Sequence, residues 1–281
     1  MRQLKQMPLA VSSPTEPLPA QAPALPRLRV SKLCIAVHGA TSAELFSRAE
    51  SARKDSGFIE FRLDALDKPA AALAEFKTFL ARHREVTAIA TCRRKPLGGH
   101  FTGSLNSEIE LLLKAAEAGA HIVDLEVESA EQATRPQLAK FRAALRAAGA
   151  VLLISSHDFS RTRRRDGLNQ TAQRIAAFEP EFVKVVSTAR SLADNLSVLH
   201  MVQDQSLNAH VVGIAMGEEG LISRILSPRA GAAFTFASLS EGTETAPGQV
   251  SARTLLDVYR LEQIDRSDRV HVKVIVRSRC S

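Results

Sequence analysis

Short apolar runs alternate with segments of helical period along most of this 281-residue chain. Eight runs have the length and composition of buried β-strands: Leu33–Val37, Phe58–Leu63, Val86–Cys92, Ile122–Val127, Val151–Ser155, Phe182–Val186, His210–Ile214 and Ala233–Ala237. Segments with helical spacing lie between and after them: Ser42–Ser56, Pro69–Arg84, Leu105–Gly119, Ala133–Ala148, Asn169–Phe178, Ser191–Gln205, Leu221–Ser227 and Ser251–Gln263. Strict alternation predicts βαβ units around a parallel sheet. Eight repeats predict an α/β fold, a single-domain (β/α)8 TIM barrel, because that fold takes about 250 residues.

Capping and turn residues agree with these boundaries. Ser42 can cap the first helical segment, and Pro69 suits the first turn of the second. Gly119 and Gly149 suit the C-terminal ends of two later helices. No Gly-x-Gly-x-x-Gly sequence follows the first strand, so the sequence argues against an open dinucleotide-binding sheet.

Composition divides the chain into three segments. Residues 1–30 are rich in proline and show no period, which predicts a flexible N-terminal extension outside the fold. Residues 31–264 contain the eight repeats and form the barrel. Residues 265–281 form a basic C-terminal tail with one apolar patch.

Composition also excludes several classes of protein. No run approaches the ~18 apolar residues of a membrane-spanning helix, and the N-terminus lacks the apolar core of a signal peptide. Cys34, Cys92 and Cys280 make neither a disulfide framework nor a metal-ligand pattern. We therefore expect a cytoplasmic protein with no membrane partner and no metal.

The net charge favours an anionic partner. The formal charge is +7, which suits either an anionic small molecule or loose binding to nucleic acid. Aromatic residues make up only 5% of the chain and include no tryptophan, so surfaces for stacking on single strands are scarce. The sequence therefore predicts a small anionic substrate and no nucleic-acid partner.

One predicted strand has a lysine at its centre. Lys184 lies between apolar residues in Phe182–Val186, where a strand of a parallel sheet is buried on both faces. Burial of an unpaired ammonium is costly, and the usual result is a neutral amine at working pH. A neutral amine attacks carbonyl groups and forms a Schiff base. The alternative is a lysine at a strand end that reaches water.

Other polar side chains gather where the predicted strands end, which is the face that carries active sites in TIM barrels. They are Glu60, Arg62, Asp64, Arg93, Asp124, Glu126, His157, Lys184 and Arg224. His157 is a candidate general acid/base because its unperturbed pKa is near neutral. Arginine suits a carboxylate-bearing substrate. A lysine and a histidine together indicate imine formation followed by proton transfer, as in an aldolase or a dehydratase.

The strand-end motifs resemble those of the type I 3-dehydroquinate dehydratase family. Six motifs occur in the family's order: Ile59–Asp64; Thr91–Arg93 with Gly98-Gly99; Ile154–Phe159; Val183–Val185; Met216-Gly217 with Gly220–Arg224; and Thr245–Gln249. The resemblance covers residues 33–263. It implies a (β/α)8 barrel, a homodimer, no cofactor or metal, and dehydration of 3-dehydroquinate to 3-dehydroshikimate in the shikimate pathway.

The resemblance also implies roles for individual residues. Lys184 matches the lysine that forms the imine, and His157 matches the general acid/base. Substrate-binding positions are matched by Glu60, Arg62, Arg93, Arg224, Thr245 and Gln249, with the substrate carboxylate assigned mainly to Arg224. Pocket-lining positions are matched by Met216, Phe236 and Ala246.

The chain departs from the family pattern at one position that bears on the histidine. Bacterial members commonly carry a glutamate before the two glycines, where it orients the histidine, and this chain has Leu97 there. Asp124 is our candidate replacement. The departure also motivates an alternative, a catalytically impaired homologue that binds quinate-like ligands. A further alternative is a sugar-phosphate aldolase, which would need a phosphate cradle near Gly217–Gly220, where Glu218 and Glu219 would repel phosphate.

Overall fold

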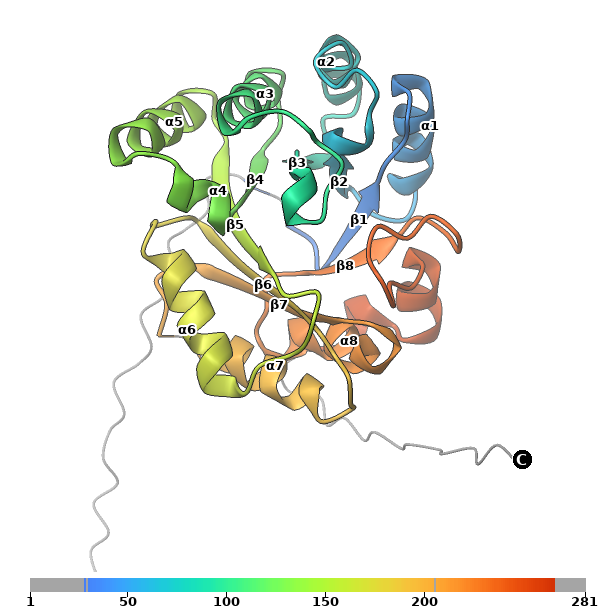
Figure 1. Ribbon diagram of the computed structural model, residues 1–281. Coiled ribbons are helices and arrows are strands. Elements are labelled where there is room, and N and C mark those ends of the chain that lie inside the picture. The colour runs from blue at the N-terminus through green and yellow to red at the C-terminus, as the bar shows by residue number, and fades with distance from the viewer. Residues whose placement is uncertain (1–27, 29, 205, 266–281) are drawn as a thin grey trace, which may run out of the picture.

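The computed structural model describes residues 28, 30–204 and 206–265 (Figure 1). Eight parallel strands form one sheet in the order β7-β6-β5-β4-β3-β2-β1-β8. Their bounds are β1 Leu33–Val37, β2 Phe58–Arg62, β3 Thr87–Thr91, β4 Ile122–Glu126, β5 Val151–His157, β6 Phe182–Thr188, β7 His210–Met216 and β8 Thr235–Ser238. All eight predicted strands are present, and the prediction of a (β/α)8 TIM barrel is confirmed.

The barrel closes between the first and last strands. β1 pairs with β2 on one side and with β8 on the other, where Ile35 lies opposite Ala237. At the remaining seam the amide of Ala233 donates to the carbonyl of Val211 at 2.8 Å, next to the start of β8. The sheet is therefore nearly closed around one interior.

Helices cover the outside of this barrel (Figure 1). Their bounds are α1 Ser42–Ala52, α2 Leu73–Arg82, α3 Leu105–Glu117, α4 Val127–Gln132, α5 Arg135–Ala147, α6 Arg165–Ala176, α7 Asp194–Gln203 and α8 Leu221–Ala230. Side-chain oxygens cap three of them, because Thr41, Ser104 and Thr134 accept amide hydrogens of the first turns. Gly119 and Gly149 have φ of 110° and 78° directly after α3 and α5, so they end these helices as expected.

Several helix predictions were wrong in detail. Thr41 rather than Ser42 is the first cap, and α2 begins at Leu73, after Pro69. The short helix α4 was not predicted. The last predicted helix, Ser251–Gln263, is instead a π-helical turn at Thr254–Val258 and a 3₁₀ turn at Leu261–Gln263. Between these turns Arg260 has a φ of 50°, which a regular helix does not allow.

The barrel interior has an apolar floor and a polar upper part. Side chains of alternate strand residues fill the floor, and the rings of Phe58 and Phe182 each meet Phe234 edge to face, at 4.8 and 5.7 Å between centroids. Two residues further along their strands, Glu60 and Lys184 point into the same interior. The fold thus places charged groups above an apolar floor, at the carboxyl ends of the strands.

The barrel begins slightly before the boundary that we expected at residue 30. Leu28 and Val30 are partly buried against the apolar floor, so these two residues pack with the barrel. The rest of the predicted N-terminal extension, and the basic tail except residue 265, lie outside the described residues, as does Cys280. Within the described part of the chain, every helix is too short or too polar to cross a membrane.

Candidate active site

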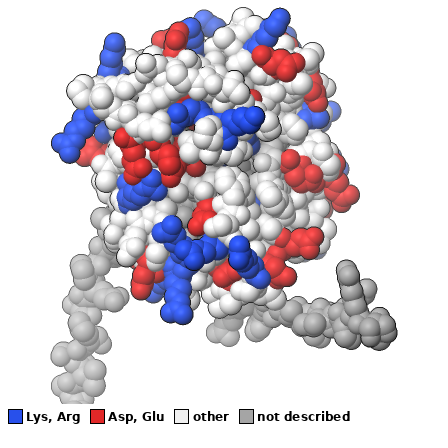
Figure 2. Space-filling model, viewed as in Figure 1, with Lys and Arg blue, Asp and Glu red and all other residues white. Residues whose placement is uncertain are grey.

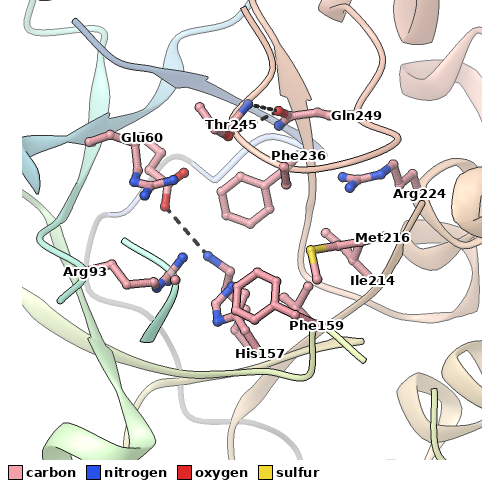
Figure 3. A pocket seen from close by; sticks show the side chains of 15 residues that line it. Glu60, Arg93, His157, Phe159, Ile214, Met216, Arg224, Phe236, Thr245 and Gln249 are labelled. Atoms are coloured by element: carbon pink, nitrogen blue, oxygen red, sulfur yellow. Dashed lines mark hydrogen bonds and ion pairs between the residues drawn. The ribbon is translucent and has the colours of Figure 1, made fainter. Parts of the chain in front are cut away.

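A pocket opens at the carboxyl ends of the strands, over the polar part of the interior (Figure 3). Eleven of the twelve predicted site residues line it: Glu60, Arg62, Arg93, His157, Lys184, Met216, Arg224, Phe236, Thr245, Ala246 and Gln249. The twelfth, Asp124, is buried beside the pocket. Six strands or the segments after them contribute the eleven lining residues, and β4 contributes Asp124, so the pocket depends on closure of the barrel.

Lys184 lies at the centre of the polar cluster. Its side chain is 5% exposed, and its Nζ donates to Oδ2 of Asp124 at 2.9 Å. Oε1 of Glu60 is 3.7 Å from the same nitrogen, and the ring centroid of Phe236 is 4.3 Å away. The sequence correctly predicted a buried lysine but not its two carboxylate neighbours. These groups hold the amine in one position beside the pocket.

Asp124 is held as a carboxylate beneath the pocket. Burial alone would raise its pKa, but the nearby cations of Lys184 and Arg93 outweigh burial, and its pKa is lowered. The Ser155 hydroxyl lies 2.5 Å from its Oδ1, and Arg93 Nη2 lies 3.3 Å from its Oδ2. Asp124 therefore serves the lysine and not the histidine.

Glu126 contacts the histidine. Nδ1 of His157 lies 3.0 and 3.1 Å from the two carboxylate oxygens of Glu126. Our prediction that Asp124 orients His157 is therefore wrong. The carboxylate that accepts the hydrogen bond of His157 is Glu126, two positions later on β4. An ionised carboxylate accepts a hydrogen bond from Nδ1–H, which leaves Nε2 of the neutral ring without a proton and free to act as a base.

Burial and charge act on this pair in opposite directions. Burial lowers the pKa of His157, the cation of Arg93 lowers it further, and Glu126 opposes both. Burial would raise the pKa of Glu126, but His157 and Arg93 outweigh it and lower that pKa. The net result is a histidine that favours its neutral form, which is the form a general base needs.

Arg93 joins the lysine and histidine parts of the cluster. Its Nε donates to Glu126 at 3.0 Å, and its Nη2 reaches Asp124 and Ser155, both at 3.3 Å. Gly99 makes this position possible, because a Cβ at residue 99 would lie 2.0 Å from the carbonyl oxygen of Arg93. The two glycines after β3 thus let the loop fold back tightly on the arginine.

Arg62 and Glu60 form the wall that β2 provides. Arg62 makes two parallel hydrogen bonds to Asp64, at 2.9 and 2.8 Å, and its side chain is 9% exposed. Glu60 accepts a hydrogen bond from the Thr91 hydroxyl at 2.7 Å. Both residues line the pocket. These bonds fix polar groups at positions where substrate hydroxyls can reach them.

Arg224 is a buried cation with a free hydrogen-bond donor. Its Nη2 donates to the carbonyl of Pro247 at 3.2 Å, while its Nε has no partner among the described residues. Burial lowers the pKa of Arg224 to about 10. Figure 3 shows Arg224 and Met216 on one side of the pocket and Glu60 and Arg93 on the other. A buried guanidinium without a carboxylate partner is a strong site for an anion.

The segment after β8 forms the remaining edge of the pocket. Oε1 of Gln249 accepts hydrogen bonds from the amide and the hydroxyl of Thr245, at 2.8 and 3.1 Å. Gly248, with a φ of 67°, lies so close to Gly217 that a Cβ would be 2.2 Å from its carbonyl oxygen. The loop that carries Gln249 thus packs on the segment after β7, and this packing fixes the orientation of the Gln249 side chain.

The sequence reasoning missed several residues. We placed Glu126 on the fourth strand but gave it no role. Its position two residues after Asp124 puts both side chains on the same face of that strand, which was a usable signal. Phe159 is 52% exposed and its ring stacks beside His157, with centroids 6.0 Å apart. Gly98, Val186 and Ile214 complete the lining.

No group of three or more His, Cys, Asp or Glu side chains in the described part of the chain is arranged to hold a metal ion. The chemistry available is that of a buried amine, a neutral imidazole with its carboxylate, and several fixed guanidinium groups. An amine that can form an imine, with a base beside it, is suited to proton removal next to a carbonyl carbon.

Comparison with known proteins agrees with this geometry. A family model described as type I 3-dehydroquinase matches residues 33–266. A 3-dehydroquinate dehydratase of Dehalococcoides mccartyi is 36% identical over 217 residues, covering 75% of this chain and 90% of the relative. One of Coxiella burnetii is 27% identical over 233 residues, covering 83% and 94%. The chain belongs to the type I 3-dehydroquinase family.

Solved structures support the fold. The crystal structure of 3-dehydroquinate dehydratase from Geobacillus kaustophilus superposes with a TM-score of 0.72 at 24% identity, covering 83% of this chain and 93% of that one. The type I enzyme from Clostridium difficile gives a TM-score of 0.71 at 20% identity, covering 82% and 91%. That structure of the Clostridium difficile enzyme is one with covalently modified comenic acid.

Proposed function

We propose that this protein dehydrates 3-dehydroquinate to 3-dehydroshikimate, as a hydro-lyase (EC 4.2.1.10) of the shikimate pathway that works through a lysine Schiff base. The observation that carries the proposal is the meeting of three groups at one pocket. These are the buried amine of Lys184, the imidazole of His157 and the guanidinium of Arg224, which has no carboxylate partner among the described residues. Membership of the family supports the choice of substrate.

In the first step, His157 accepts one proton from the Lys184 ammonium, and the resulting amine attacks the ketone carbon of the substrate. A carbon–nitrogen bond forms and the carbonyl double bond opens. The oxygen takes one proton from the nitrogen and one back from His157 and leaves as water, so a protonated imine remains. Asp124 and Glu60, at 2.9 and 3.7 Å from Nζ, are placed to stabilise the positive charge of that iminium. The same two carboxylates orient the amine before attack.

In the second step, Nε2 of His157 removes a proton from the carbon next to the iminium. The electron pair moves toward the nitrogen and forms an enamine. The enamine then expels the hydroxyl group on the next carbon, and His157 returns the proton so that the hydroxyl leaves as water. Hydrolysis of the resulting imine releases the product and regenerates Lys184. Glu126 stabilises the imidazolium that exists between the two proton transfers.

The remaining site residues hold the substrate. Arg224 binds the substrate carboxylate, because it is the buried guanidinium without a described carboxylate partner. Glu60, Arg62, Arg93, Thr245 and Gln249 bind its hydroxyl groups and the far side of its ring, and Met216, Phe236 and Ala246 line the pocket. This scheme requires no metal and no cofactor.

The contact between Glu126 and His157 weakens the case for a binding protein without activity. The motive for that alternative was Leu97, which replaces a glutamate that orients the histidine in bacterial relatives. Here a different carboxylate occupies the Nδ1 side of the ring. We further propose that the enzyme is a cytoplasmic homodimer, and light scattering on the purified chain tests the oligomeric state.

The first experiment traps the imine. The wild-type protein and the Lys184→Ala variant are incubated with 3-dehydroquinate and borohydride, and the intact mass is measured. We expect an adduct on the wild type alone, together with 3-dehydroshikimate in a parallel sample without borohydride. An adduct on Lys184→Ala would move the imine to another lysine. A folded wild type with neither adduct nor product would refute the proposed function.

A further inference from the structure

The segment between β5 and α6 is unusually rich in arginine. It begins directly after His157 and Asp158, and four of the five residues 161–165 are arginines. Arg190, after β6, donates from its Nε to the carbonyl of Ser160 at 2.7 Å and joins the same region. All five side chains are exposed. We call this group the arginine lip: Arg161, Arg163, Arg164, Arg165 and Arg190.

The arginine lip is anchored to the barrel. The Thr162 hydroxyl lies 2.8 Å from that of Ser187 on β6, and the Thr188 hydroxyl donates to the carbonyl of Asp158 at 2.9 Å. The amide of Arg161 donates to Asp158 Oδ1 at 3.1 Å. These bonds hold the arginines at the carboxyl ends of β5 and β6, close to the catalytic pocket.

A groove beside the lip shares part of its lining with that pocket. The groove is lined by Arg161 and Arg163 and also by His157, Phe159 and Val186. The last three residues line the catalytic pocket as well, so the two cavities adjoin at these residues. In Figure 2 a blue patch lies just below the centre of the face, where Figure 1 shows the chain between β5 and α6. Positive charge therefore lies beside the catalytic pocket.

Most of this charge is not neutralised by close ion pairs. Arg163 is 3.8 Å from Asp158 and Arg165 is 3.9 Å from Asp204, both beyond hydrogen-bond distance. The guanidinium groups of Arg161 and Arg164 have no carboxylate within 4.0 Å among the described residues. By contrast, Arg174 of the same groove pairs closely with Glu128 and Glu131. The arginine lip therefore keeps a positive electrostatic potential, because the carboxylates of the protein itself neutralise little of its charge.

We propose that the arginine lip attracts the anionic substrate and raises its concentration beside the pocket that contains Lys184. This inference rests on the proposed function, since it takes the substrate carboxylate as the attracted group. Clusters of one charge sign at the mouth of a low-dielectric cleft increase the rate of productive encounter, and salt screens the effect. The lip acts on encounter and not on the chemical steps.

The test compares the wild type with Arg161→Gln/Arg163→Gln/Arg164→Gln at ionic strengths from roughly 20 to 500 mM, a range over which the screening length falls severalfold. We expect kcat/KM of the wild type to fall as salt rises. At low salt the triple variant should have a kcat/KM about three- to tenfold lower, with a weaker dependence on salt and an unchanged kcat.

A matched control removes the same three charges elsewhere. Lys77, Arg135 and Lys140 are exposed on α2 and α5, outside the barrel, and their triple replacement by glutamine should keep the wild-type kcat/KM and its salt dependence. Equal effects of the two triple variants, no effect of the lip variant, or a fall in kcat as large as that in kcat/KM would each overturn the inference. A wild type without turnover would overturn the proposed function and this inference with it.

Discussion

Replacing Glu126 by glutamine tests the assignment of the carboxylate that serves the histidine. Glutamine has nearly the same shape but removes the negative charge 3.0 Å from Nδ1 of His157. Arg93 loses one of its two carboxylate partners and keeps the other, Asp124. The fold should therefore survive while the histidine loses its counter-charge.

The size of the effect follows from the geometry. When His157 accepts the substrate proton, its positive charge is centred a few ångströms from the carboxylate of Glu126. At an effective dielectric constant of about 20, two charges 4 Å apart interact by about 4 kcal/mol. Arg93 lies next to the same carboxylate and cancels part of this gain. We expect a net loss of about 1.4–2.7 kcal/mol in the transition state, which lowers kcat about 10- to 100-fold.

The pH dependence gives a second and independent readout. Glu126 raises the pKa of His157 against burial and Arg93, which lower it. Removal of Glu126 therefore lowers this pKa further. Because the base must be neutral, activity falls as pH falls through the pKa of His157 in the free enzyme. The acidic limb of the kcat/KM profile should move to lower pH in Glu126→Gln.

The assay is a pH profile of kcat and kcat/KM for the wild type, Glu126→Gln and Glu128→Gln. Glu128 is a suitable control because it lies two residues further on, partly exposed, and pairs with Arg174 at 3.1 Å. It should leave both kcat and the acidic limb unchanged. An unaltered acidic limb in Glu126→Gln, or a limb at higher pH, would refute the reasoning.

Two further predictions concern residues at the edge of the site. Because burial lowers the pKa of Arg224 to about 10, the charged form destabilises the fold at neutral pH, and stability rises as pH rises through that value. Arg224→Met should stabilise the protein by about 1–3 kcal/mol in urea unfolding, yet raise KM more than about 100-fold; lower stability with an unchanged KM would contradict this. Gly99→Ala should lower kcat/KM about tenfold, because its Cβ would displace Arg93. Gly242→Ala is strained by its φ of 80° and should lower stability, but its Cβ meets nothing within 4 Å, so this control should have wild-type kinetics.

The sequence predicted the barrel well because parallel strands leave a strong local signal. A strand buried on both faces needs a continuous apolar run, so each strand is visible without knowledge of its neighbours. Phe182–Val186, for example, forms the first five residues of β6, which spans Phe182–Thr188. The prediction of one continuous helix at Ser251–Gln263 was wrong, because apolar spacing alone gives no signal of an interruption in a helix. Arg260 turns the chain with a positive φ, and neither glycine nor proline marks the place.

The sequence also located the residues of the candidate site, since active-site groups in this fold lie at the carboxyl ends of strands. Lys184, His157 and Arg224 could be selected on that basis and by resemblance to the family. Their individual roles stay predictions until the variants are measured. The sequence could not predict which charged groups of the cluster pair with one another.

That pairing was decided by the register of the sheet. Asp124 and Glu126 are two residues apart on one face of β4, and the sequence alone does not distinguish them. In the barrel, Glu126 lies opposite Ser155, and Ser155 lies opposite Lys184. This stagger directs Asp124 to the lysine and Glu126 to His157. The sequence by itself determined most of the groups that line the site. Only the closed sheet determined which carboxylate contacts the lysine and which contacts the histidine, because the stagger of neighbouring strands is a property of the whole barrel.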